Sequence, residues 1–195
     1  MDTSESLGHA LRAAGELLAR RGAAAGIVVV GGTALNLLGV VRRVTRDVDV
    51  IATGTPQPDG PPEDIQLPHP LPHPLGEVIA TVARDLQLPA DWMNTTVAGQ
   101  WKTGLPPGFA GRITWRRYGG LWVGLAGRHD LIHLKLYAAA DDVGPSSRHF
   151  KDLLALAPTP AELEAARGWI ASQDPSPAMA QAVASVINYV RQAGR

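Results

Sequence analysis

The stretch Val28-Val29-Val30-Gly31-Gly32-Thr33, followed by Asp47-Val48-Asp49-Val50, decides the expected fold. An apolar run that breaks into two glycines and continues as the helix-compatible segment 34–38 predicts a strand, a tight turn and a helix N-terminus. Successive side chains of a strand point to opposite faces, so Asp47 and Asp49 should share one face and the two valines the other. Two neighbouring carboxylates beside a glycine turn indicate a site for a divalent cation and a phosphate.

Length and composition limit the classes of protein to consider. With 195 residues, of which 45% are hydrophobic, the chain can form one domain with a core and a helical appendage. A net charge of zero gives no global basic field, so any nucleic-acid binding must come from a local patch. The absence of cysteine excludes disulfides, thiolate catalysis and cysteine-bound metals. Without a signal peptide or a long apolar segment, we expect a cytoplasmic protein that does not enter membranes.

The fold class predicted from the pattern is α+β: a mixed sheet flanked by helices in residues 1–127, with a helical region packed on it in residues 128–195. Residues 56–74 are rich in proline and predict a surface loop. The expected elements of the first region are an amphipathic helix ending near Gly22, strands 27–30 and 47–51, helix 75–86, and strands 111–118 and 121–125 joined by Gly119-Gly120 in a hairpin.

Capping signals predict the C-terminal helices. Asp130 precedes segment 131–140 as an expected N-cap, and Ser146 or Ser147 should cap a helix that ends at residue 157. Thr159-Pro160-Ala161-Glu162 combines an N-cap threonine, a proline at the first helical position and a glutamate at the third, which predicts another helix start. A final helix should follow Asp174-Pro175-Ser176-Pro177.

Two blocks of sequence resemble known families. Gly31-Gly32-Thr33 with Arg42 and Thr45-Arg46-Asp47-Val48-Asp49 resembles the signature of the DNA polymerase beta-like nucleotidyltransferase superfamily. Residues 130–139, which include Lys135, and Arg148-His149-Phe150-Lys151-Asp152-Leu153 look like the lysine helix and the Arg-x-x-Lys-Asp helix of abortive-infection-type nucleotidyltransferase toxins of type IV toxin-antitoxin systems. The resemblance covers most of the chain.

This resemblance implies transfer of a nucleoside monophosphate from an NTP to an RNA, such as tRNA, or to a protein, with a cognate antitoxin as partner. Asp47 and Asp49 would be the catalytic ligands of Mg²⁺ or Mn²⁺. Gly31, Gly32 and Thr33 would hold phosphates at the start of the helix, and Lys135 would neutralise the triphosphate. Asp152 would orient Lys135 or assist deprotonation of the acceptor. Arg148 and Lys151 are phosphate contacts or surface charges.

Other functions stay open because the chain departs from the family pattern. The hairpin carries no third carboxylate, and Ala155 stands where the toxins usually have a second aspartate. A catalytically silent nucleotide-binding or interaction module is therefore one alternative. An antibiotic nucleotidyltransferase is another, although only Asp141 and Asp142 would offer acidic groups to a cationic drug. The arginines in 42–46 and 112–117 favour an RNA acceptor.

Overall fold

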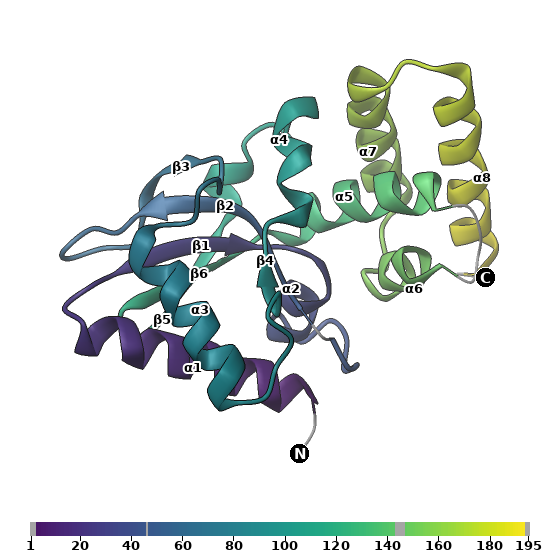
Figure 1. Ribbon diagram of the computed structural model, residues 1–195. Helices are drawn as coiled ribbons and strands as arrows, with labels where there is room; N and C mark the ends of the chain where they lie inside the picture. Colours follow the sequence, from purple (N-terminus) through teal and green to yellow (C-terminus); the bar gives the residue numbers. More distant parts are fainter. Residues whose placement is uncertain (1–2, 46, 143–146, 194–195) are drawn as a thin grey trace. The chain divides into compact units, whose positions relative to one another are not determined.

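The chain divides into two compact units in a computed structural model that describes residues 3–45, 47–142 and 147–193. The sheet unit comprises residues 1–102 and 110–126, and the helical unit comprises residues 103–109 and 127–195. The division between Ala126 and Gly127 falls next to the expected boundary, whereas the assignment of residues 103–109 to the helical unit was not foreseen. Figure 1 shows the elements of both units in chain order.

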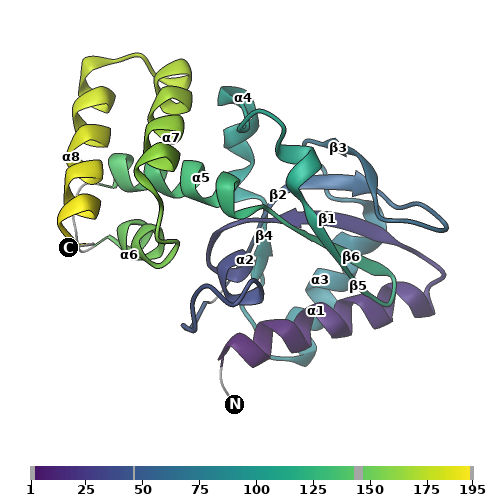
Figure 2. The same cartoon turned by 180° about the vertical axis from the view of Figure 1, so that it is seen from behind.

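The sheet unit is a mixed sheet with the strand order β3-β2-β1-β6-β5 and a short strand β4 paired to β2. β1 pairs in parallel with β6 and antiparallel with β2, and the hairpin β5–β6 is antiparallel. Helices α1 and α3 lie side by side along one face of the sheet (Figures 1 and 2). The elements of this unit are α1 (Thr3–Arg20), β1 (Ala25–Val29), α2 (Gly31–Leu37), β2 (Val48–Thr55), β3 (Glu63–Gln66), α3 (His73–Asp85), β4 (Met93–Asn94), α4 (Gln100–Thr103), β5 (Thr114–Tyr118) and β6 (Leu121–Leu125), with short 3₁₀ turns η1 (Thr96–Gly99) and η2 (Phe109–Arg112).

The α+β class is confirmed, as are the glycine turn, the neighbouring strands and the hairpin. All residues of β1 are buried, which fits a strand that is paired on both edges and covered on its faces. The helix after the turn starts earlier than predicted, at Gly31 itself, so both glycines belong to its first turn. β2 starts one residue later than predicted, at Val48, so Asp47 lies just before the strand, and β2 runs further than predicted, to Thr55.

The prediction of a loop for residues 56–74 was wrong in part. β3 lies inside this segment and pairs antiparallel with β2 at the edge of the sheet, and α3 already begins at His73. The residues of β3 are mostly exposed and polar, so no hydrophobic alternation announces the strand. Its backbone pairs with β2 because the outer edge of that strand offers donors and acceptors that need partners.

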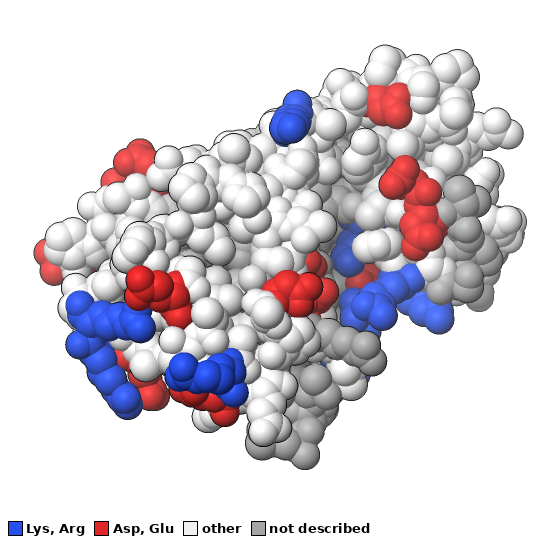
Figure 3. All heavy atoms as spheres, viewed as in Figure 1, with Lys and Arg blue, Asp and Glu red and all other residues white. Residues whose placement is uncertain are grey.

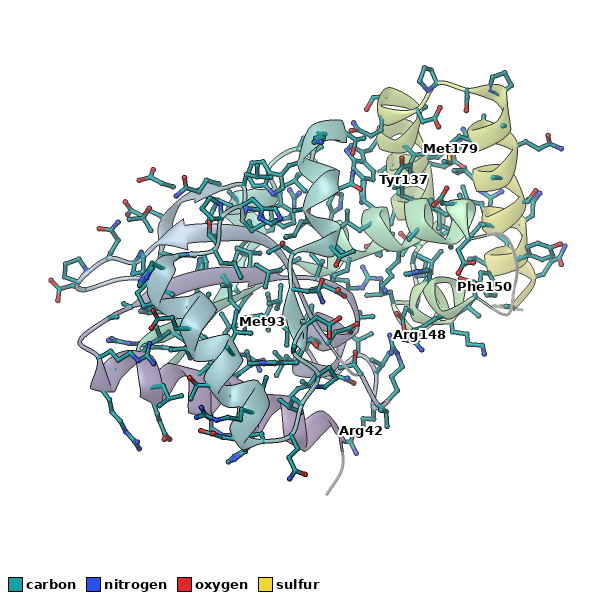
Figure 4. All side chains as sticks on the ribbon, viewed as in Figure 1. Arg42, Met93, Tyr137, Arg148, Phe150 and Met179 are labelled. Carbon is teal, nitrogen blue, oxygen red and sulfur yellow. The ribbon has the colours of Figure 1, made fainter. Side chains whose placement is uncertain are left out.

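The helical unit is organised around α5 (Arg128–Asp141), which packs against α6 (Arg148–Ala155), α7 (Pro160–Gln173) and α8 (Pro177–Ala193). Ser147 caps α6 by accepting from the His149 N–H, while Ser146 lies outside the described residues. The predicted capping box of Thr159 and Glu162 is present. Figure 4 labels Tyr137, Phe150 and Met179 on α5, α6 and α8 respectively.

Asp130 is not the N-cap of α5. The N-cap is Gly127, three residues earlier, and Asp130 is fully buried in the first turn of the helix. The helical hydrogen bonds already begin at Gly127, whose carbonyl oxygen accepts from the Leu131 N–H at 2.9 Å. The Arg128 guanidinium donates to the carbonyl oxygens of Leu156 and Ala157 and to the Glu162 carboxylate. These bonds hold the first turn of α5 against the connection between α6 and α7.

Charged groups on the surface of the sheet unit are mixed. Over α1 and α3, Lys and Arg side chains lie next to Asp and Glu in Figure 3. Arg21, just after α1, contacts Glu77 on α3 at 2.7 Å, and Arg20 lies 3.8 Å from Glu16. Among the described side chains of this face, cationic and acidic groups are therefore interspersed (Figure 3). Within the described parts of the chain, none of the helices combines the length and apolar character needed to span a bilayer.

Candidate functional site

The glycine turn meets the second aspartate where β1 and β2 pair. The Val30 N–H donates to the Asp49 carbonyl oxygen at 3.1 Å, which brings the start of α2 alongside Asp49. Gly31 has a φ of +68°, a conformation that favours glycine. A Cβ atom at Gly31 would also overlap Oδ2 of Asp49. The side chain that Gly31 lacks would thus occupy the space taken by the carboxylate.

Side-chain hydrogen bonds hold the segment before β2 against α2. The Thr33 hydroxyl donates to the Asp47 carbonyl oxygen at 2.6 Å. The Asn36 side chain donates to the Arg43 carbonyl oxygen at 2.9 Å and accepts from the Arg43 N–H at 3.3 Å. Asn36 therefore fixes the backbone around Arg43, and Thr33 fixes the backbone of Asp47. Sequence reasoning missed Asn36, because a helical asparagine carries no signal of its long-range partner.

Gly32 and Thr33 were expected to hold phosphates, but both make close contacts within the chain. A Cβ atom at Gly32 would lie 2.6 Å from the Thr45 hydroxyl oxygen and 2.9 Å from Nη2 of Arg43, so the close approach at this glycine is between two parts of the chain. Thr33 is buried and uses its proton on Asp47. The described groups that come next to the glycine turn are the Arg43 guanidinium, the Thr45 hydroxyl and the Asp49 carboxylate.

The two aspartates follow the alternation predicted from the sequence. Val48 and Val50 are fully buried, whereas Asp47 and Asp49 are partly exposed. Asn94 on β4 pairs with Asp49 in register. Arg46, between the threonine and the first aspartate of the motif, lies outside the described residues.

The carboxylates beside the glycine turn are a pair rather than a full set of metal ligands. Within the described residues, no group of three or more His, Cys, Asp or Glu side chains is placed to hold a metal. Magnesium usually keeps several waters and takes one or two carboxylates together with substrate phosphates. Asp47 and Asp49 would supply such a pair of carboxylates, with the remaining ligands coming from water and a polyphosphate.

A second cluster of predicted site residues lies in the helical unit. Lys135 on α5 and Asp152 on α6 form an ion pair with Nζ and Oδ2 2.7 Å apart, and their side chains are only 7% and 2% exposed. Asp152 thus stands where an orienting group for Lys135 was expected. Nδ1 of His149 lies 3.5 Å from Nζ of Lys135. Burial, followed by the Lys135 charge, lowers the pKa of His149 below its usual 6.5, so the imidazole is neutral near pH 7.

The remaining predicted cations are exposed on α6. Arg148, labelled in Figure 4, stands in the first turn of the helix, and Lys151 follows one turn later. Their exposure suits either a phosphate contact or a surface charge. His149 lies between them. It was not predicted as a site residue, because it occupies a variable position of the Arg-x-x-Lys-Asp block. What the sequence did not reveal is its contact with Lys135.

The structure therefore assembles the predicted residues into two clusters, one within each unit. Gly31, Gly32, Thr33, Asp47 and Asp49 gather in the sheet unit, while Lys135, Arg148, Lys151 and Asp152 gather in the helical unit. Comparisons with protein-family models, with curated proteins and with solved structures find no match to this chain.

Proposed function

We propose that this protein is a magnesium-dependent nucleotidyltransferase that transfers a nucleoside monophosphate from an NTP to an RNA acceptor such as tRNA. The observation that carries the proposal is the contact between the Gly31 backbone and the Asp49 carboxylate at the paired ends of β1 and β2. A glycine in the left-handed conformation and an acidic side chain are brought together at a partly exposed position. Their meeting across two strands is what the resemblance to the polymerase beta-like superfamily implies.

The reaction requires in-line attack on the α-phosphorus. The bond from the acceptor oxygen to this phosphorus forms, the bond to the bridging oxygen of the β-phosphate breaks, and pyrophosphate leaves. When bound, magnesium stabilises the developing charge and favours loss of the acceptor proton. Asp47 and Asp49 would hold the metal at the reacting phosphate. Thr33 fixes the backbone of Asp47, so it acts here as a positioning residue rather than as a phosphate donor.

Positive charge beside the glycine turn supports the binding of a polyanion. The Arg43 guanidinium lies against Gly32, and the Asn36 amide holds the Arg43 backbone in place. A planar guanidinium binds phosphate through paired hydrogen bonds. Arg43 would thus contact the triphosphate while the two aspartates hold its metal ion.

Exposed arginines on the edge strand support an RNA acceptor. Arg116 and Arg117 lie on β5, and the Arg117 guanidinium stacks 5.3 Å from the centre of the Trp122 ring. The protein has no net charge, but these two arginines and Arg42 offer local contacts for phosphates on the sheet unit. The resemblance to type IV toxins supports a role as a toxin restrained by an antitoxin.

The test is a labelling assay with each α-labelled NTP, magnesium and total tRNA. The parent protein is compared with an Asp47→Asn, Asp49→Asn double variant, which keeps the side-chain shapes and removes both charges. Asp59→Asn serves as the matched control, because Asp59 is an exposed carboxylate in a loop of the same unit. We expect transfer by the parent and the control, and a loss of at least about 100-fold in the double variant, since even supporting groups of a metal site are worth 10–100-fold.

The outcomes separate the proposal from its alternatives. Label on RNA that persists in the folded double variant would refute the assignment of the aspartates. Binding of magnesium-NTP by calorimetry with no transfer to any RNA would favour the silent module. Transfer to an aminoglycoside but not to RNA would favour the antibiotic-modifying enzyme.

A further inference from the structure

A groove opens on the sheet unit beside the strand that pairs with Asp49. It has a volume of about 580 Å³, which lies within the range of small-molecule sites. Its walls come from β4, η1, Lys102 of α4 and the segment between β3 and α3. Met93, labelled in Figure 4, and Asn94 line it from β4, and Asn94 is the register partner of Asp49. Adjacent strands are about 4.8 Å apart, so the groove starts one strand away from the proposed metal ligand.

The apolar part of the lining suits a flat ring. It is formed by Leu67, Leu71, Met93 and Ala98. Leu67 is 45% exposed and is one of three large hydrophobic side chains that the described residues leave to water. Covering such a side chain with a ligand is favourable because it removes apolar surface from water.

The polar part of the lining is neutral apart from one cation. Nε2 of His69 lies 3.0 Å from the Thr95 hydroxyl oxygen, and Asn94 and Thr96 also face the groove. Lys102 lines its end, and no Asp or Glu is among the described lining residues. Hydroxyl, amide and imidazole groups can hydrogen-bond the edge of a base, and an imidazole can stack on its face. A cationic drug would find no acid here, whereas a nucleotide would find a cation.

We propose that this groove holds the nucleobase of a nucleotide that reacts at Asp49, with its ring against Leu67, Leu71 and Met93 and its edge at His69 and Thr95. This inference rests on the proposed function and extends it by naming a subsite for the base. The same chemistry would serve the base of the NTP or that of the acceptor's reacting nucleotide. The experiment distinguishes these two sources.

The test fills the groove without disturbing the core. Gly99 lines the groove, and a Cβ atom built there meets nothing within 4 Å, so Gly99→Phe adds a ring in open space. Gly60→Phe is the matched control, because Gly60 is equally open and lies outside the lining. Circular dichroism and thermal midpoints check that both variants fold. The probes are the four NTPs and inorganic tripolyphosphate with magnesium, measured by calorimetry, and total tRNA in the labelling assay.

If the base comes from the NTP, Gly99→Phe weakens NTP binding by at least about tenfold, as expected for the loss of a base contact, and leaves tripolyphosphate binding unchanged. If the base comes from the acceptor, NTP binding is unchanged and KM for RNA rises by at least about tenfold. Either result supports the proposal, provided that Gly60→Phe behaves like the parent. Thr95→Val should then change the ranking of the four bases.

The proposal is overturned if Gly99→Phe changes neither NTP binding nor KM for RNA, if it weakens tripolyphosphate equally, or if the parent binds no nucleotide. The proposed function is tested by a different variant. It is refuted if the Asp47→Asn, Asp49→Asn double variant still transfers the nucleotide. A groove that binds nucleotides in a protein whose aspartates are dispensable would keep the base subsite but refute a reaction at Asp49.

Discussion

Removal of the Asp152 carboxylate should strongly destabilise the helical unit. Its ion pair with Lys135 joins α5 to α6 at 2.7 Å, with side-chain exposures of 2% and 7%. Asp152→Leu leaves an ammonium group buried without this partner, a change that costs about 3–5 kcal/mol in other proteins. With a slope of about 2 kcal/mol per molar urea, the midpoint of unfolding should fall by about 2 M.

The double variant Lys135→Met, Asp152→Leu tests the physical cause. It replaces both charges by apolar groups of similar volume, so neither member is left unpaired. Such replacements are often neutral or stabilising, and we expect a free energy of unfolding within about 1 kcal/mol of the parent value. The two substitutions should therefore be strongly non-additive in a double-mutant cycle.

The measurement follows the helical unit by itself. Trp169 is the one tryptophan of that unit in the sequence, so fluorine NMR of protein labelled with 5-fluorotryptophan reports its unfolding separately from the other four. Glu164→Gln is the control, because Glu164 lies 2.6 Å from Arg167 but the two side chains are 43% and 58% exposed. Exposed pairs contribute about 0–1 kcal/mol. A loss below about 1 kcal/mol in Asp152→Leu, or additive single variants, would refute the reasoning.

Two further predictions concern the glycine turn and the buried histidine. Gly31→Ala should lower the free energy of unfolding more than Gly39→Ala. Both glycines have positive φ, which costs alanine about 1–2 kcal/mol, but only at Gly31 would the added Cβ atom overlap the Asp49 carboxylate. Equal losses in urea unfolding would mean that Asp49 does not fill this space. The lowered pKa of His149 predicts that stability is fully present above pH 6.5 and falls as the pH drops below that value, because the unfolded chain binds the proton more tightly. The groups that act on His149 are Lys135, Asp142, Asp152 and Arg148, and NMR titration of its ring should give a midpoint below 6.5; a midpoint at or above 6.5 would contradict this.

Local signals predicted the starts of α6 and α7 and the centre of the sheet. The capping box at Thr159 was predicted because its hydrogen bonds join residues only three positions apart. The glycine turn and the aspartate strand were predicted for a similar reason, since strand alternation and glycine conformation act over a few residues. Sequence reasoning placed the start of α5 wrongly at Asp130, because the cap is Gly127 and the first turn holds Arg128, whose partners lie far away in the sequence, at Leu156 and Glu162.

The site could be predicted as a set of residues but not as a set of contacts. Asp49 and Gly31 were both candidates, yet only the pairing of β1 with β2 shows that the carboxylate takes the space of the missing side chain. The clamp of Asn36 on Arg43 and the contact of His149 with Lys135 had no periodic signal. Such contacts depend on how separate helices and strands pack, which short-range patterns do not encode.

By itself, the amino-acid sequence determined where apolar periodicity changes from strand to helix, where the glycines turn the chain, and that Asp47 and Asp49 alternate with the buried Val48 and Val50. Tertiary structure alone decided that the polar segment β3 completes an edge of the sheet, that Lys135 and Asp152 neutralise each other inside the helical unit, and that a groove begins beside Asp49. The physical reason is distance along the chain. Backbone propensity acts between neighbours, whereas burial, edge pairing and desolvated charge depend on residues that only folding brings together.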